Sequence, residues 1–428
     1  MLGISVRCAA VFYAGLALGV GPVWGDSPPR EQAGPAAGQP LTAEQLAVWV
    51  LEANPGLAAI QAAAQAAAYR IDPAGSLDDP MFAYGAAPLT ADSNRGLNQK
   101  LEFSQKIPWP GTLAAREAAA RHEAVAADRD VDALRLRVVA QAKSAYAEWR
   151  FLDEALDIHH ATQALLDELI ATTQTRYAAG RALKQDVLQA EVERTDLDNQ
   201  ELRLLSQQAT VQARINALLN RAPDAPLPEA APILLRPAPP ALEALQTLAL
   251  AQHPDLSRLN AQASASKSRV TLAEKAFYPD FQVGVGYDSL WDEPDKRPVF
   301  GVSINLPFDR SKRKSELNRA RADTRRAEWS LIERRAELLA DLAQARAEVL
   351  EAQASLVLYQ DELVPLASEY LEAALADYQS GTGAFLNVIT AERRKLSTHL
   401  ALARARADYA RRLAELERSA GGPLNPSQ

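Results

Sequence analysis

Two pairs of segments alternate apolar and polar residues with the two-residue period of β-strands. The clearer pair spans residues 281–287 and 300–306, and its apolar positions are Phe281, Val283, Val285, Tyr287, Phe300, Val302, Ile304 and Leu306. Successive side chains of a strand point to opposite faces, so each segment predicts a strand with one apolar and one polar face. A polar loop at residues 289–298 joins the two strands into a hairpin.

A second, earlier pair repeats this pattern less regularly. Its strands are expected at residues 82–86 and 101–107, around a loop at residues 91–96, and its polar positions include Lys100, Glu102, Ser104 and Lys106. An apolar-out, polar-in alternation of about ten residues is typical of transmembrane β-barrel strands. Trp109, Trp291 and Phe308 lie near strand ends, where such barrels carry aromatic girdles. The alternative is a hairpin half-buried on a soluble domain.

Long helical patterns follow each strand pair. They are expected at residues 112–178 and 311–379, each about 100 Å long at 1.5 Å per residue, and neither has an interior glycine. Pro365 is expected to kink the second. Each ends in a glycine-containing turn, and helices at residues 184–220 and 385–418 then return. The sequence therefore predicts two long helical hairpins, whose small apolar residues suit coiled-coil packing.

The chain contains the same unit twice. Residues 80–82 and 279–281, at the start of each strand pair, are 199 positions apart, and the turn motifs at residues 177–180 and 378–381 are 201 apart. Such a period is far longer than that of solenoid repeats, so it indicates one duplicated unit. We assign the first repeat to residues 42–222 and the second to 241–419, each with a helix before its strands. The Pro-rich residues 223–240 form the linker between them.

The N-terminal segment has the features of an export signal. An apolar stretch follows Arg7, and Gly25 ends a plausible cleavage site, so we expect a signal peptide at residues 1–25 and a flexible leader at 26–41. Cys8 lacks a lipobox, so lipidation is not expected. Residues 420–428 are assigned to a tail. No later segment has 18 unbroken apolar residues, which excludes a transmembrane helix.

Composition narrows the functional class. The net charge of −8 argues against a nucleic-acid partner, and Cys8 is the only cysteine, which excludes a disulfide framework or cysteine zinc site. Asp157, His159 and His160 are read as solvated surface groups and not as metal ligands. The basic residues 310–314 are read as a solvated collar at a membrane edge, with no binding role. No catalytic motif is present, so we expect no enzyme and no cofactor.

Four strands cannot close a barrel, and open edges are not tolerated in lipid. The chain must therefore oligomerise, with eight strands in a dimer or twelve in a trimer. Twelve strands leave a channel, which the glycine-rich polar faces suit.

At this point the chain resembles the TolC-type outer-membrane efflux factor family. The resemblance covers residues 42–419 and includes the strand-pair-then-hairpin order, its duplication, and the Tyr-x-x-Gly motifs at Tyr177 and Tyr378 with their Asp/Asn-Val-Leu/Ile continuations. Residues 104–111 are similar to the junction of the cobalt-zinc-cadmium (heavy-metal) branch. The resemblance implies a mainly α fold with membrane β: a homotrimer with a 12-stranded outer-membrane barrel and a periplasmic α-barrel tunnel of coiled-coil hairpins.

The resemblance also implies a function and its partners. The chain would be the exit duct of a tripartite efflux pump for small solutes, metal cations included, with a periplasmic adaptor and an inner-membrane transporter of the resistance-nodulation-division type. It would lie in outer-membrane lipid with a large periplasmic part. Two alternatives stay open: the duct of a type I protein secretion system, and a periplasmic coiled-coil adaptor. The alternation at residues 281–287 disfavours the adaptor.

In this family the tunnel closes at the helical tips, which implies candidate site residues here. Gate candidates are Asp186, Tyr378, Asn387, Thr390 and Arg406, with Tyr378 and Arg406 as a latch against Asp186. Family members often carry acidic rings where this chain has Asn387 and Thr390, so we expect weak cation block. The adaptor-contact residues are expected at the exposed turns: Gly180, Arg181, Ala182, Gly381, Thr382 and Gly383.

Overall fold

The computed structural model describes residues 40–87, 98–234, 236–289, 291 and 293–424. The proposed signal peptide, almost all of the leader and the loop of the first strand pair lie outside this range. Residues 35–428 belong to one compact unit, and it contains all the elements discussed below.

The strands form one antiparallel sheet in chain order. They are β1 (Met81–Ala87), β2 (Asn98–Ile107), β3 (Asp280–Asp288) and β4 (Pro298–Asn305), so the two hairpins lie side by side and β1 and β4 form the edges. One row of cross-strand partners crosses the whole sheet and is entirely aromatic or branched: Phe82, Phe103, Val285 and Phe300. All four side chains are exposed in the single chain, between 48% and 83%. The alternation in sequence therefore produces a sheet with one continuous apolar face that the chain leaves uncovered.

The first repeat supplies five helices. They are α1 (Ala43–Ala53), α2 (Pro55–Ala68) and α3 (Ile71–Gly75) before its strands, and α4 (Thr112–Ala178) and α5 (Lys184–Leu218) after them. The Thr42 side chain accepts from the Gln45 backbone N–H at 3.2 Å while the Gln45 side chain accepts from the Thr42 N–H at 3.0 Å, which makes a capping box at the start of α1.

The second repeat supplies α6 (Leu242–Gln252) and α7 (Pro254–Lys275) before its strands. After them come α8 (Arg310–Leu358), α9 (Val364–Ser380) and α10 (Phe385–Ala420). A short 3₁₀ turn, Pro294–Lys296, lies in the β3–β4 loop.

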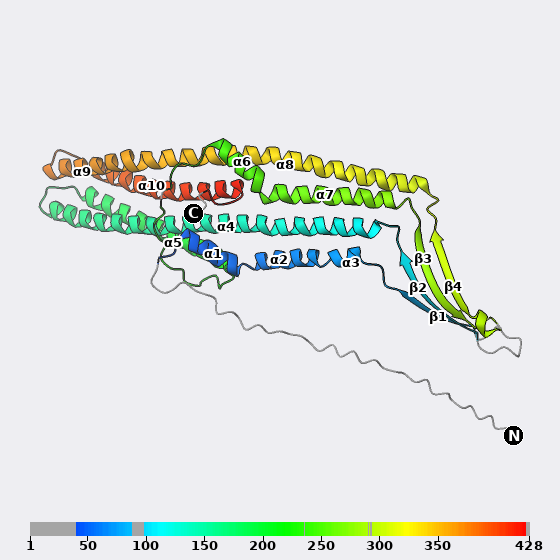
Figure 1. Cartoon of the computed structure of the whole chain (residues 1–428). Helices are drawn as coiled ribbons and strands as arrows, with labels where there is room; N and C mark the ends of the chain where they lie inside the picture. The colour runs from blue at the N-terminus through cyan, green and yellow to red at the C-terminus, as the bar shows by residue number, and fades with distance from the viewer. Residues whose placement is uncertain (1–39, 88–97, 235, 290, 292, 425–428) are drawn as a thin grey trace, which may run out of the picture. The chain divides into compact units, whose positions relative to one another are not determined.

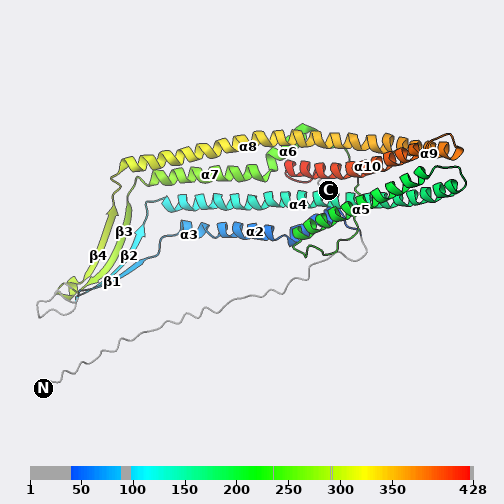
Figure 2. The ribbon, with the colours of Figure 1, turned by 180° about the vertical axis from the view of Figure 1, so that it is seen from behind.

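The helices that adjoin the strands continue the order of the sheet. Helix α4 packs between α2 and α7, and α7 packs against α8, so the helical order α2, α4, α7, α8 matches the strand order β1, β2, β3, β4 (Figures 1 and 2). Helix α4, which follows β2, forms a hairpin with α5. Helix α8, which follows β4, continues as α9, and together they form a hairpin with α10. A single layer of helices therefore prolongs a single layer of strands.

The second long helix is interrupted next to Pro365, where we expected a kink. A π-helical turn, Tyr359–Leu363, separates α8 from α9, and Pro365 lies at the start of α9. Proline has no N–H to donate to the preceding turn, and a wider i→i+5 turn removes the need for that bond. The helical run thus continues to the tip with one wide turn inside it.

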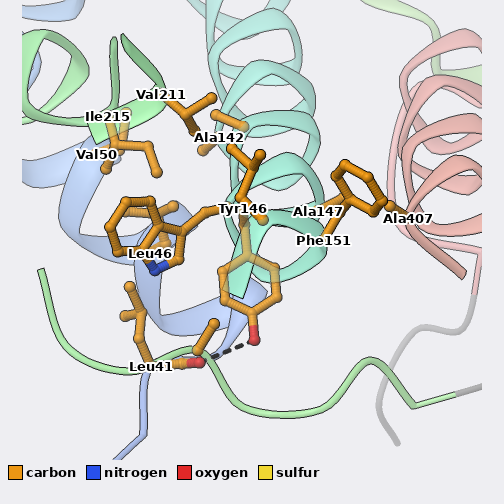
Figure 3. Close-up of a cluster of buried hydrophobic side chains, with 14 of the residues drawn as sticks. Leu41, Leu46, Val50, Ala142, Tyr146, Ala147, Phe151, Val211, Ile215 and Ala407 are labelled. Carbon is orange, nitrogen blue, oxygen red and sulfur yellow. Dashed lines mark hydrogen bonds between the residues drawn. The ribbon is translucent and has the colours of Figure 1, made fainter. Parts of the chain in front are cut away.

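The largest buried cluster surrounds Tyr146 of α4. Figure 3 shows Leu41, Leu46 and Val50 from the N-terminal segment packing with Val211 of α5, while Phe151 faces Ala407 of α10. The Tyr146 hydroxyl lies 2.9 Å from the Leu41 backbone oxygen and 2.6 Å from that of Ala231. Burial raises the pKa of Tyr146 to about 12, so it remains a donor to these carbonyls.

The end of the leader, which we expected to be flexible, and the linker between the repeats both contact the core here. Leu41, assigned to the flexible leader, is almost fully buried and forms a parallel bridge with Ala230 of the linker. Arg236 of the linker pairs with Glu44 at 2.6 Å and with Glu417 at 2.9 Å. The end of the leader and the linker are therefore part of the core, because their backbones and apolar side chains fill the space between α1, α4 and α10.

Candidate functional site

The helical tips are built on residues that the backbone geometry requires. Gly180 and Gly381 have φ of +71° and +84°, a region that favours glycine. Gly383 is needed for a different reason, because a Cβ there would lie 2.8 Å from the Asp377 Cβ. Arg181 and Thr382 are exposed in these turns, whereas Ala182 is half-buried. The turns thus present mostly backbone and small side chains to their surroundings.

One arginine joins the tips of the two repeats. Arg176, in the last turn of α4, donates hydrogen bonds to the backbone oxygens of Tyr378 at 2.8 Å and Gln379 at 2.6 Å. The last carbonyls of a helix lack intrahelical donors and carry partial negative charge, so a guanidinium is a favourable partner. The same guanidinium lies 4.9 Å from the centre of the Tyr378 ring.

Tyr378 is the gate candidate that this link involves. Its ring is buried and packs edge-to-face against Phe385, the first residue of α10, with centroids 5.2 Å apart. Its hydroxyl has no hydrogen-bond partner among the described residues, so the side chain acts here through its ring. Sequence reasoning missed Arg176 because its partners lie about 200 positions away in the chain and are backbone atoms.

The structure does not support the latch between Arg406 and Asp186. Arg406 donates to Glu154 of α4 at 2.6 Å, and it lies twenty-one residues beyond Phe385, about 30 Å along α10. Asp186 instead accepts from the Leu183 backbone N–H at 3.3 Å and so caps its own helix. The prediction was wrong because charge and family position alone do not say where along a long helix a partner lies.

The remaining gate candidates are exposed on α10 near the tip. Asn387 and Thr390 lie three residues apart and therefore on one face, and the Thr390 hydroxyl donates to the Leu386 backbone oxygen at 2.8 Å. Neither residue carries charge.

A buried carboxyl lies slightly farther from the tip. Glu392 of α10 is 2% exposed, and its Oε2 has no hydrogen-bond partner in the part of the chain that the structure describes. Nearby Glu193 of α5 is also buried and accepts from Arg393 Nε at 2.7 Å. Burial, and then the Glu193 carboxylate, raise the pKa of Glu392 to about 7, against opposing effects of Arg393 and Lys395. This ionisable group was not identified from the sequence.

The polar face of the sheet forms a shallow groove. It is lined by Lys100, Glu102, Ser104, Gln282, Gly284, Gly286, Gly301 and Ser303. Gln282 Nε2 donates to Ser104 Oγ at 3.0 Å, and Lys100 Nζ lies 3.1 Å from Glu102 Oε2. Val285, Tyr287, Val299 and Val302 also contribute to the lining, and Val299 lies on the same face as Gly301 and Ser303. Because most side chains on this face are polar or absent, the face is suited to water.

Aromatic residues gather where the sheet meets the helices. Trp109 stacks on Tyr278 with centroids 4.7 Å apart and lies 6.0 Å from Phe281. Phe308 is exposed at this end of the sheet, and Trp291 is exposed in the β3–β4 loop at the other end. The aromatic girdle itself stays a prediction.

Of the two adjacent histidines that we expected at the surface, only His160 is exposed. His160 is exposed and lies 3.1 Å from Glu201, but His159 is buried, with Nδ1 3.1 Å from the Ala155 backbone oxygen. His159 follows Ala155 by one helical turn on the face that packs against α5. In the described residues no group of three or more His, Cys, Asp or Glu side chains is placed to hold a metal ion.

No single helix among the described residues is long and apolar enough to cross a bilayer. The bent pair Ala43–Ala53 with Pro55–Gly75 meets that criterion by length and composition only.

Comparison with known proteins gives one family and several structures of the same fold. The family model described as outer membrane efflux protein matches twice, over residues 46–221 and 245–422. No curated protein sequence matches the chain.

Solved structures similar to this chain are outer-membrane proteins. VceC from Vibrio cholerae has 22% identity and a TM-score of 0.77, over 90% of this chain and 97% of that one. The Campylobacter jejuni CmeC outer membrane channel has 16% identity and a TM-score of 0.76, over 90% and 87%. CusC, described in terms of transmembrane channel formation, has 17% identity and a TM-score of 0.77, over 89% and 92%.

Proposed function

Because the chain belongs to the outer membrane efflux protein family, we propose that it is the exit duct of a tripartite efflux pump. Its cargo would be small solutes, which would pass from the pump to the exterior. The duct of a type I protein secretion system is the second candidate, since the same tube would pass an unfolded polypeptide.

The observation that carries the proposal is the sheet. Its apolar face is uncovered across all four strands, and among the described residues the edge strands β1 and β4 pair on one side only. Unpaired strand edges are too costly in lipid, so only closure with further strands makes this sheet stable there. Three copies would give a 12-stranded barrel with the glycine-rich polar face toward water, and we therefore propose a homotrimer in the outer membrane.

The helices support the same assembly. On α5, Leu188, Val192, Leu202 and Leu205 are exposed, and so are Val357, Leu366 and Tyr370 along α8 and α9. Exposed apolar stripes on helices are usually covered by other helices. Neighbouring copies in a ring would cover them and would close the helical layers into a periplasmic tunnel.

The tips are the proposed contact for a periplasmic adaptor, because Gly180, Arg181, Gly381 and Thr382 are exposed there. The adaptor would connect the duct to an inner-membrane transporter, for which we propose the resistance-nodulation-division type. A heavy-metal cargo is a narrower version of the proposal. It would place metal selection in the transporter, since the chain offers few soft ligands.

Single-channel recording in planar bilayers, with the mass of the detergent-solubilised particle measured in parallel, tests the proposal. We expect a trimer and discrete conductance steps. We also expect weak cation block, which Asp186→Asn should leave unchanged, because Asn387 and Thr390 carry no charge at the mouth.

A monomer that remains soluble without detergent and never inserts would refute the duct and favour the periplasmic adaptor. Export of a polypeptide, but of no small solute, by cells that carry the channel would favour the secretion duct.

A further inference from the structure

The internal repeat relates the middle of the sheet to its two edges. Strand β4 is the equivalent of β2, and β1 is the equivalent of β3, at an offset of 199 residues. The β2–β3 junction inside the chain therefore has an equivalent that a single chain cannot form: β4 of one copy beside β1 of another. Because β4 and β1 each have an outer edge with no strand beside it among the described residues, the inner junction is a template for the outer one.

The inner junction is held by specific side chains at its helical end. Ile107 of β2 lies opposite Phe281 of β3. Just beyond, the Trp109 backbone N–H donates to Asp280 Oδ1 at 3.2 Å, and Lys106 Nζ lies 3.6 Å from Asp280 Oδ2. The Trp109–Tyr278 stack completes the anchor.

The outer edges lack these anchors. The equivalents by the 199-residue offset are Asn305 for Lys106, Phe308 for Trp109, Met81 for Asp280 and Asp79 for Tyr278. If the outer junction forms, something else must hold it.

The net charges on the two sides of the outer junction are opposite in sign, although Asp309 lies on the basic side and Arg70 on the acidic side. The cations are Arg310, Lys312 and Lys314, at the start of α8, and the anions are Asp72, Asp78 and Asp79, before β1. All six residues are exposed, and no side-chain ion pair is seen for any of them within the described residues. Their equivalents in the inner junction are uncharged: Gly111, Leu113, Ala115, Thr271, Phe277 and Tyr278. The charges are therefore specific to the edges.

The inner junction also indicates how close these groups would come. Gly111 lies against Lys275, because a Cβ on Gly111 would be 3.3 Å from the Lys275 Cε. The equivalents are Arg310 and Ser76, and Ser76 lies between Asp72 and Asp78 in the chain. Superposing the outer junction on the inner one thus places a cation of one copy among the aspartates of the next.

In the proposed ring, β4 lies beside β1 of a second copy of this chain, and the register of the β2–β3 junction puts Leu306 opposite Phe82 of the partner subunit. We propose that residues 310, 312 and 314 form a charged seam with the aspartates at positions 72, 78 and 79 of that subunit. The proposal rests on the proposed ring of copies and on this register, and it adds the chemistry of the contact. It also gives the basic residues 310–314, first read as a solvated collar, a binding role. A head-to-tail seam of this kind uses two different surfaces, so it does not form an isolated symmetric pair, and it forms a ring when the rotation from copy to copy closes.

Charge reversal tests the seam. We expect Asp78→Lys with Asp79→Lys to raise the protein concentration at which the detergent-solubilised trimer half dissociates by about tenfold at low salt, and less at high salt because ions screen exposed charges. Arg310→Glu with Lys312→Glu should act likewise. The four changes together should restore the wild-type midpoint. Glu293→Lys with Asp295→Lys, an equal change of charge at the far end of the β3–β4 hairpin, is the matched control and should have no effect.

Cysteine cross-linking tests the register independently, in a Cys8→Ser background. Transposing the observed pair Lys106 and Gln282 puts Asn305 opposite Ala83 of the partner subunit. Asn305→Cys with Ala83→Cys should form an intersubunit disulfide. Asn305→Cys with Met81→Cys should not, because the displaced Cα atoms are too far apart.

Failure of the seam can be distinguished from failure of the proposed duct. A wild-type trimer that is insensitive to charge reversal, or that cross-links only in the displaced pair, overturns the seam and leaves the duct standing. A wild-type protein that never forms a trimer overturns both.

Discussion

At the scale of single residues, Glu392 makes the protein sensitive to pH. Its pKa of about 7 lies above the ordinary value for glutamate, so between these two values the folded chain binds more protons than the unfolded chain. Stability should therefore fall as pH rises through this window and stay lower above it. Glu392→Gln should remove that fall, so its melting temperature should exceed the wild-type value at pH 8 and approach it at pH 5.

Thermal unfolding of detergent-solubilised protein at a series of pH values measures this effect. Glu191→Gln is the matched control, because Glu191 is an exposed glutamate on the neighbouring α5. If Glu392→Gln and Glu191→Gln have the same pH profile, the buried carboxyl is not the titrating group.

Arg176 is the residue whose loss should open the tips. Arg176→Ala removes two charge-assisted hydrogen bonds to α9, each worth about 1–3 kcal/mol, and leaves the terminal carbonyls without this donor. The resting single-channel conductance should rise, and Arg176→Lys should restore it only in part because lysine cannot contact both carbonyls in the same way.

Arg406→Ala is the comparison for that experiment. Its ion pair with Glu154 lies far from the tips, so the variant should lose thermal stability without gaining conductance. A rise in conductance for Arg406→Ala equal to that of Arg176→Ala would contradict this assignment and favour the latch expected from the sequence.

Arg176 and Glu392 show what could not be predicted from the sequence at this scale. Tyr378 was correctly assigned to the tip region because it belongs to a local motif that repeats. Arg176 and Glu392 have no such signal, since each matters only because α4, α5, α9 and α10 pack together. A lone arginine or glutamate on a long charged helix looks the same in sequence whether it is solvated or buried.

At the scale of elements, two glycines of the sheet differ in whether the structure leaves room for a side chain. A Cβ at Gly286 would lie 2.8 Å from the Leu101 backbone oxygen, whereas at Gly301 it would meet nothing within 4 Å. Gly286→Ala should therefore strain the β2–β3 pairing by about 1–3 kcal/mol, and Gly301→Ala should be nearly neutral. The temperature at which the folded band is lost on semi-native gels measures the difference, and equal losses would show that neither contact limits stability.

The elements themselves were largely predictable. Strand alternation and the absence of interior glycine in the long helices are local signals, and the observed bounds of α4, Thr112–Ala178, are those expected. The π turn and the buried Leu41 were not predictable. The first depends on how a helix accommodates Pro365, and the second on a partner strand in the linker that periodicity does not reveal.

At the scale of the whole molecule, the duplication determines much of the architecture. It explains why the four strands form one sheet in chain order and why helices in matching order prolong them. The packing of the two hairpins against each other at the tips could not be derived in this way, because it joins parts of the two repeats that have diverged.

The π turn at Tyr359–Leu363 has a consequence for how the two halves of the chain could diverge in length. One residue added to an ordinary α-helix rotates every later side chain by about 100°, which would turn a buried stripe toward solvent. A single wide turn absorbs such a surplus, and Leu371, Ala374 and Tyr378 beyond it still face the core. The offset between the repeats grows by two residues, from 199 at the strands to 201 at the tips, and the π turn accommodates one of them. The second arm could thus lengthen by one residue at this turn while its inward-facing residues kept their phase.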